Sequence, residues 1–173
     1  MLVIDLSERD PELVKKLIEL GGEDLLKCYQ CGTCVADCPT GIAEENLSPK
    51  RLIHMVKLGL AEQLLEDETP WMCVTCTTCE ERCPRDAKPF EIILAIRRWQ
   101  CREDETYIPM SVVEVYERGH TQNVFNPLRE ELELPPIKTV AASEEELGKF
   151  REMLRLTWVV REHGYLFGVG DEE

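Results

Sequence analysis

The sequence lacks the long apolar runs, the alternating strand patterns and the excess of basic residues that mark several common classes of protein. Its uncharged apolar runs, such as Ile92 to Ile96, are far shorter than the roughly 20 residues that cross a bilayer, so we expect no direct membrane insertion. Only 20 Lys and Arg oppose 34 Asp and Glu, and the formal charge of −14 argues against nucleic acid as a partner. No convincing period-two pattern is present, which favours an all-α fold.

An apolar export signal is also missing, because the segment from Met1 to Asp10 carries charged residues where such a signal would be apolar. We therefore expect a cytoplasmic protein in a reducing environment. Nine cysteines in 173 residues are a large excess. In a reducing compartment, clustered cysteines are more often metal ligands than disulfides, so the cysteines indicate a metal site.

The cysteines form an internal repeat, in which the second copy follows the first at an offset of 45 residues. Both copies read C-x2-C-x2-C-x3-C-P and together use eight of the nine cysteines: Cys28, Cys31, Cys34 and Cys38, then Cys73, Cys76, Cys79 and Cys83. A loop that turns back at every third residue directs three thiolates to three irons of one cubane. The sequence therefore predicts two [4Fe-4S] clusters.

The fourth cysteine of each motif is predicted to bind the cluster of the other motif, as it does in two-cluster ferredoxins. The first cluster would then be held by Cys28, Cys31, Cys34 and Cys83, and the second by Cys73, Cys76, Cys79 and Cys38. Such crossed ligation brings the clusters close together, so that they exchange electrons. Two structural zinc ions are the alternative, but zinc sites usually pair two separated C-x2-C knuckles. Cys101 is predicted to be a packed side chain without a redox role.

Helical patterns surround both motifs. Apolar residues recur at helical spacing in segments 10–20, 48–65, 89–99 and 109–119. A proline lies at or near the start of each segment, Gly59 interrupts the second one, and glycines end the first and the last. We divide the chain into an N-terminal helix (1–22), a dicluster ferredoxin domain (23–101) and a helical C-terminal extension (102–173). Within the extension, the proline-rich segment 123–139 is predicted to be an irregular linker. The expected fold is thus an α-helical ferredoxin-like domain with two cluster-binding loops.

A last helix is predicted from Ser143, which forms a capping box with Glu146, to about His163. Its apolar surface is wider than one stripe, so it needs a partner surface. Two interpretations remain open: the helix packs onto the protein's own helical core, or it extends as an arm onto another subunit.

Polar residues near the motifs are further candidates. Small side chains leave room for hydrogen bonds to sulfur at Gly32, Thr33, Thr75, Thr77 and Thr78. A local basic run in this acidic chain is either ordinary surface or stabilises reduced clusters and orients a partner: Arg82, Arg85, Lys88, Arg97 and Arg98.

The stretch from Lys27 to Trp99 resembles the C subunit of heterodisulfide reductase. The resemblance rests on Cys28-Tyr-Gln-Cys-Gly-Thr-Cys and on Trp71-Met-Cys-Val-Thr-Cys-Thr-Thr-Cys-Glu-Glu-Arg-Cys-Pro-Arg85. The long helical spacer is similar to that of the α-helical ferredoxin domain in succinate dehydrogenase iron-sulfur subunits. The resemblance implies an electron-transfer subunit of an oxidoreductase complex. It would take electrons from a flavin-bearing A-type subunit and pass them to a disulfide-reducing B-type subunit.

Other functions stay open at this point. A related sulfur-oxidation or respiratory dehydrogenase complex would use the same cluster-bearing subunit. An enzyme with substrate on an open iron would need a cluster with only three cysteines, and an iron-sulfur redox regulator would need a basic nucleic-acid-binding element. No G-x-G-x-x-G flavin motif or disulfide-reducing site is visible, so we assign no catalytic residue and expect electron conduction without bond chemistry.

Overall fold

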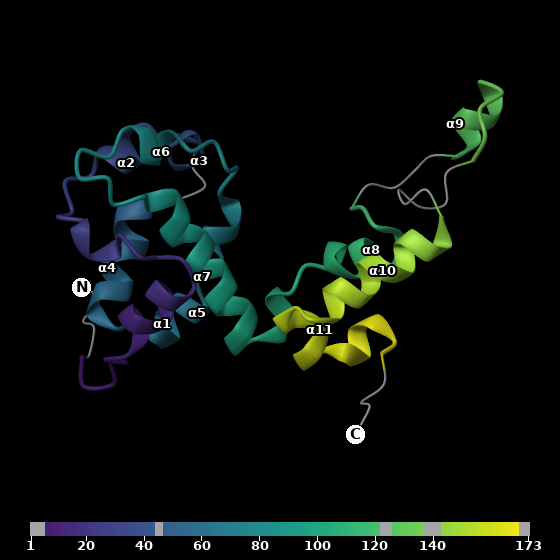
Figure 1. Ribbon diagram of the computed structural model, residues 1–173. Coiled ribbons are helices and arrows are strands. Elements are labelled where there is room, and N and C mark those ends of the chain that lie inside the picture. Colours follow the sequence, from purple (N-terminus) through teal and green to yellow (C-terminus); the bar gives the residue numbers. More distant parts are fainter. Residues whose placement is uncertain (1–5, 44–46, 122–125, 137–142, 170–173) are drawn as a thin grey trace. The chain divides into compact units, whose positions relative to one another are not determined.

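The computed structural model describes residues 6–43, 47–121, 126–136 and 143–169. These residues form α-helices and 3-10 helices without a strand, which confirms the predicted all-α fold (Figure 1). The chain divides into two compact units, Met1–Tyr107 and Ile108–Glu173. None of the helices in the described ranges is both long enough and apolar enough to cross a membrane.

The first unit contains both cysteine motifs. Its helices are α1 (Leu13–Glu19), α2 (Thr33–Ala36), α3 (Pro39–Ile42), α4 (Pro49–Leu58), α5 (Ala61–Leu65), α6 (Thr78–Glu81) and α7 (Pro89–Glu103), with 3-10 turns η1 (Leu25–Lys27), η2 (Thr69–Met72) and η3 (Glu105–Tyr107). Local signals set the ends of α4, because the Ser48 hydroxyl accepts from the Arg51 amide at 3.3 Å and Gly59 ends the helix with φ 75°. Proline at the first position begins both α4 and α7.

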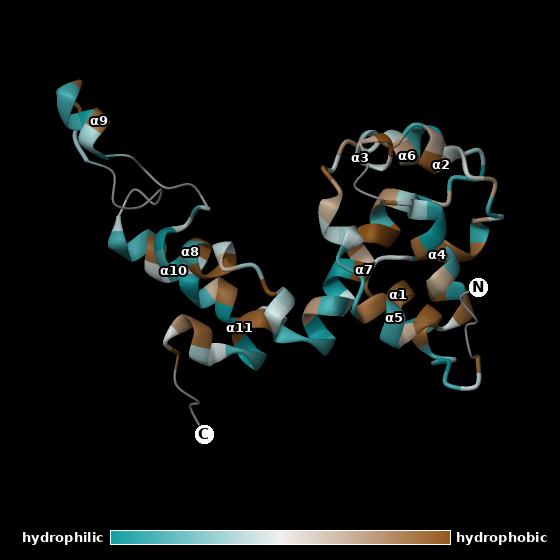
Figure 2. Ribbon diagram, turned by 180° about the vertical axis from the view of Figure 1, so that it is seen from behind, coloured by the Kyte–Doolittle hydropathy of each residue, from teal (hydrophilic) through white to brown (hydrophobic). Residues whose placement is uncertain are grey.

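Helices α1, α4 and α7 pack against one another around a single core. Figure 2 shows hydrophobic and hydrophilic residues alternating along α7, as expected for a helix with one buried side. The fully buried side chains include Leu13, Leu17, Leu52, Ile53, Val56, Ile92 and Ile96. Burial of each such side chain stabilises the fold by about 1.5–3 kcal/mol. The short helices α2 and α6 lie together at one end of this unit, where α2 packs on α4 and α6 packs on α7 (Figure 1).

The first helix begins later than the sequence indicates. Helix α1 starts at Leu13, and Asp10 precedes it in a turn where its carboxylate accepts from the Glu12 amide at 2.8 Å and pairs with the Lys16 ammonium at 3.0 Å. The Asp10 amide donates to the Gly59 carbonyl at 2.8 Å. An added Cβ at Gly59 would lie 2.5 Å from the Asp10 carbonyl oxygen, so the close approach of these two segments requires glycine.

The second unit has a small core of its own. Its helices are α8 (Ser111–Arg118), α9 (Asn126–Glu131), α10 (Glu144–Arg155), α11 (Trp158–Glu162) and the 3-10 turn η4 (Gly164–Phe167). Tyr116, Val160 and Phe167 form the buried centre, with the Tyr116 and Phe167 rings 5.1 Å apart in an edge contact. Helix α10 packs on α8, and Arg151 donates from its guanidinium to the carbonyls of Tyr116 and Glu117.

Two details of this unit differ from the helical pattern in the sequence. Helix α9 lies inside segment 123–139, and Pro127 is its second residue, where the missing amide is not needed. Residues 123–125 and 137–139 lie outside the described residues. The last helix is broken at Thr157, which has extended backbone and a hydroxyl that donates to the Leu154 carbonyl. Its apolar surface is only partly covered: Leu147 is buried, whereas Leu156 is 76% exposed.

Candidate metal centre

The two cysteine motifs fold into loops with the same backbone. Turn η1 ends just before Cys28 and turn η2 just before Cys73, and these two cysteines have φ/ψ of −69°/120° and −66°/119°. Left-handed residues follow at equivalent positions, Gln30 (φ 67°) and Thr75 (57°), then Gly32 (90°) and Thr77 (60°). The repeated sequence therefore gives a repeated loop that reverses direction at every third residue.

The fourth cysteine of the second motif lies beside the first motif. One pocket is lined by Cys28, Cys31, Cys34 and Cys83, together with other residues that include Lys50 and Arg85. Thiols of the first motif also lie near the second motif. Burial, followed by the negative charge of neighbouring thiolates, raises the pKa of Cys79 to about 12, and these neighbours are Cys73, Cys34, Cys76 and Cys38. Cys34 and Cys38 of the first motif are thus both close enough to influence a thiol of the second.

Both loops have the same pattern of thiol acidity. Burial and then the nearby Cys28 raise the pKa of Cys34 to about 11, which matches the raised pKa of its equivalent, Cys79. The second cysteine of each motif, Cys31 or Cys76, is exposed and has a lowered pKa. The cause is a hydrogen bond from Thr33 to Cys31 and from Thr78 to Cys76. A bound cation deprotonates a coordinating thiol outright. The buried thiols therefore need such a cation to act as thiolates at neutral pH.

Groups in the cysteine loops and just after them donate hydrogen bonds to the cysteine sulfur atoms. The Gly41 amide donates to Cys38 Sγ at 3.4 Å, and the Ala87 amide donates to Cys83 Sγ at 3.3 Å. The Gln30 side-chain amide donates to Cys28 Sγ at 3.5 Å. Soft thiolates suit iron-sulfur clusters, and hydrogen bonds to the sulfurs are one of the factors that set cluster potential. The donor set of these loops fits an iron-sulfur cluster.

No three Cys, His, Asp or Glu side chains among the described residues converge to hold a single metal ion.

Equivalent residues of the two motifs also meet each other. Asp37 and Arg82 are separated by the repeat offset of 45 residues, and Arg82 Nε lies 3.6 Å from Asp37 Oδ2. The helices that precede them, α2 and α6, are in contact. Together with the position of Cys83 beside the first motif, this ion pair indicates an approximate twofold axis between the loops.

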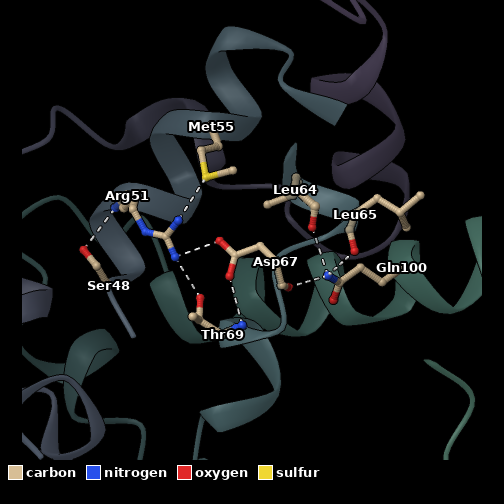
Figure 3. A network of polar contacts seen from close by, with 8 residues as sticks. All are labelled: Ser48, Arg51, Met55, Leu64, Leu65, Asp67, Thr69 and Gln100. Atoms are coloured by element: carbon tan, nitrogen blue, oxygen red, sulfur yellow. Dashed lines mark hydrogen bonds and ion pairs between the residues drawn. The ribbon is translucent and has the colours of Figure 1, made fainter. Parts of the chain in front are cut away.

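A polar network holds the segment that leads into the second motif (Figure 3). Arg51 on α4 pairs with the Asp67 carboxylate at 2.7 Å and donates to the Thr69 hydroxyl at 3.0 Å. The other Asp67 oxygen accepts from the Thr69 amide at 2.9 Å. This network fixes the start of η2, and with it the position of Cys73.

Gln100 holds the same segment from the other side. Its side-chain nitrogen donates to the carbonyls of Leu64 and Asp67 at 2.9 and 2.8 Å, and its oxygen accepts from the Trp71 indole at 2.9 Å. Gln100 is fully buried, and it satisfies a carbonyl at the end of α5 that has no partner within that helix.

In each motif, one cationic side chain contacts the backbone of the first cysteine. Only one of these two cations belongs to a pattern that the sequence shows. Lys57 on α4 donates to the Cys28 carbonyl, and Arg97 on α7 donates to the Cys73 carbonyl at 2.8 Å. Arg97 belongs to the basic run seen in the sequence, whereas nothing in the sequence singles out Lys57, which is 29 residues from Cys28.

The other candidates have varied surroundings. In the basic run, Arg82 pairs with Asp37, Lys88 lies 3.7 Å from the Asp24 carboxylate, and Arg98 donates to the Leu20 carbonyl. The Cys101 thiol donates to the Tyr107 carbonyl at 3.3 Å, and burial raises its pKa.

Comparison with known proteins identifies the family of this chain. Residues 27–88 match the family described as the 4Fe-4S dicluster domain, which covers both loops. The second iron-sulfur C subunit of the CoB–CoM heterodisulfide reductase of Methanocaldococcus jannaschii is 35% identical over 169 residues, which cover 90% of this chain and 90% of the relative. The chain belongs to the family of heterodisulfide reductase C subunits.

Other relatives of this family share shorter segments. A protein of Archaeoglobus profundus, named as similar to the heterodisulfide reductase C subunit, is 41% identical over 120 residues, which are 67% of this chain but only 61% of the relative. The C subunit of the ferredoxin/F420H2-dependent CoB–CoM heterodisulfide reductase of Methanosarcina acetivorans is 34% identical over 150 residues, or 83% of this chain and 92% of the relative.

Proposed function

We propose that this chain relays electrons through two [4Fe-4S] clusters within a heterodisulfide reductase-type complex. The observation that carries the proposal is the pocket in which Cys83 joins Cys28, Cys31 and Cys34, because it gives one cluster four thiolates drawn from both motifs. In the reciprocal assignment, which follows from the repeat of the motif, Cys38 completes the set of Cys73, Cys76 and Cys79.

The protein's own residues hold and orient the clusters in this proposal. The thiolates bind iron. The Gly41 and Ala87 amides donate hydrogen bonds to the sulfur atoms of the fourth cysteines, Cys38 and Cys83. When bound, each cluster accepts and releases electrons without making or breaking a substrate bond. Because each loop contributes to both clusters, the clusters lie close together and pass electrons between them.

The names of the relatives, which are C subunits of CoB–CoM heterodisulfide reductases, support a place in a complex of several subunits, and the resemblance implies the partner types. Electrons would come from a flavin-bearing A-type subunit and leave to a disulfide-reducing B-type subunit. We place the complex in the cytoplasm, where the thiols stay reduced before the clusters are assembled.

Metal analysis of the anaerobically purified protein tests the first part of the proposal. Two complete cubanes require about eight irons and about eight acid-labile sulfides per chain. Stoichiometric zinc, without visible absorbance that bleaches on reduction, would contradict the proposal.

The Cys38→Ser variant tests the crossed ligation. Its EPR spectrum after reduction should match that of Cys76→Ser, which damages the second cluster, and should differ from that of Cys31→Ser. A match to Cys31→Ser instead would show that Cys38 binds within its own motif. Cys101→Ala is the control, since this cysteine donates to Tyr107 and should leave iron content unchanged.

A further inference from the structure

The carbonyl of the first cysteine in each motif accepts a hydrogen bond from a cation on a long helix that comes later in the chain. Lys57 belongs to α4, which follows the first motif, and Arg97 belongs to α7, which follows the second. Their acceptors, the carbonyls of Cys28 and Cys73, are equivalent positions of the repeat. The donors themselves are not at equivalent positions of the repeat, yet each places a positive charge at the same carbonyl of its motif.

Two carbonyls and an aromatic ring hold the guanidinium of Arg97 in one position. Its Nε donates to the Pro70 carbonyl at 2.8 Å, its Nη2 donates to the Cys73 carbonyl at 2.8 Å, and its guanidinium lies 5.3 Å from the centre of the Trp71 ring. An arginine remains protonated in proteins, so these contacts hold a permanent charge. Within the part of the chain that the structure describes, no ion pair joins Lys57 or Arg97 to a carboxylate. Among the described residues, both cations therefore contact backbone carbonyls and not carboxylates.

Reduction adds one negative charge to a cluster. A nearby positive charge stabilises the reduced form more than the oxidised form, and half-buried charges are less screened by solvent than exposed ones. We propose that Lys57 and Arg97 are positioning residues that raise the reduction potentials of the two clusters, Lys57 for the cluster of Cys28 and Arg97 for the cluster of Cys73. This inference rests on the two clusters of the proposed function.

Paired substitutions separate the charge from the hydrogen bond. Arg97→Gln removes the charge and keeps an amide donor, whereas Arg97→Lys keeps the charge and loses the planar fork. Redox titration of the full chain, followed by EPR under anaerobic conditions, should show one of the two reduction steps shifted to lower potential in Arg97→Gln. Arg97→Lys should keep that step close to the wild-type value. Lys57→Gln should lower the other step, and Lys57→Arg should preserve it.

Arg98→Gln is the matched control, because it removes the same charge from the next residue of α7, where the guanidinium contacts the Leu20 carbonyl. Its two potentials should equal those of the wild type. Equal shifts in the Lys and Gln variants of Arg97, loss of the cluster in both of them, or unchanged potentials in both Gln variants would overturn the inference. Iron content separates this result from the proposed function. Wild-type protein with fewer than two clusters contradicts the proposed function, whereas two clusters with unshifted potentials contradict only the role of these cations.

Discussion

Replacement of Gln100 by Met tests whether the buried amide holds the segment that leads into the second motif. Methionine keeps the unbranched shape and approximate size of glutamine, so the substitution removes hydrogen bonds without leaving a large cavity. Three groups lose their partner: the carbonyls of Leu64 and Asp67 and the indole of Trp71.

The expected loss follows from the burial of these three groups. A buried group left without a partner costs about 1–3 kcal/mol. Leu64 is fully buried and incurs this penalty in full, whereas Asp67 and Trp71 are partly exposed, and water replaces some of their lost bonds. We therefore expect a loss of about 2–4 kcal/mol in the free energy of unfolding. The Leu65 carbonyl keeps a donor, because the Tyr107 hydroxyl contacts it at 2.7 Å.

Anaerobic urea unfolding of the cluster-loaded protein measures this loss by far-UV circular dichroism and by the visible absorbance of the clusters. The apparent midpoint should fall by roughly 1–2 M urea, given typical urea dependences. Gln63→Met is the matched control, because Gln63 is exposed on α5 and should change stability by less than about 0.5 kcal/mol. Equal midpoints for Gln100→Met and Gln63→Met would refute the role given to the buried amide.

Two further predictions concern the cluster loops and the unit that carries them. In Gly41→Ala, the new Cβ would lie 2.7 Å from the Leu47 carbonyl oxygen and 3.7 Å from Cys38 Sγ, so iron analysis should show partial loss of the cluster that Cys38 binds. Gly148→Ala on α10 meets no atom within 4 Å and should retain full iron content; equal content in both variants would contradict the prediction. A chain ending at Tyr107 should keep its iron and its thermal stability, because the first core comprises residues from Leu13 to Trp99. Co-purification of this shortened chain then tests the C-terminal unit. Loss of the B-type subunit from the purified protein would show that the C-terminal unit binds that partner.

Short-range signals made much of the first unit predictable. Ser48 and Pro49 begin α4 and Gly59 ends it, because capping depends on residues within one turn. The cysteine spacing likewise identifies the loops, since their backbone repeats at the same offset as the sequence. The assignment of each cysteine to a cluster stays a prediction, which Cys38→Ser tests.

The features that the sequence did not indicate depend on residues far apart in the chain. Gln100 contacts carbonyls 33 and 36 residues away, and Lys57 contacts one 29 residues away, so neither has a local pattern. The break at Thr157 arises for a different reason. Its hydroxyl competes for a carbonyl of the preceding turn, and the apolar periodicity continues through the break without marking it.

The Asp37–Arg82 pair has a consequence for the symmetry of the two halves. A residue beside a twofold axis meets its own equivalent, and in two identical halves that equivalent would carry the same charge and repel it. Opposite charges meet here only because the two motifs differ in sequence at this position. Two copies of either motif alone would lack this attraction. The pair therefore distinguishes one half of the cluster domain from the other. In the proposed electron path, the two clusters then lie in halves that a partner protein can tell apart.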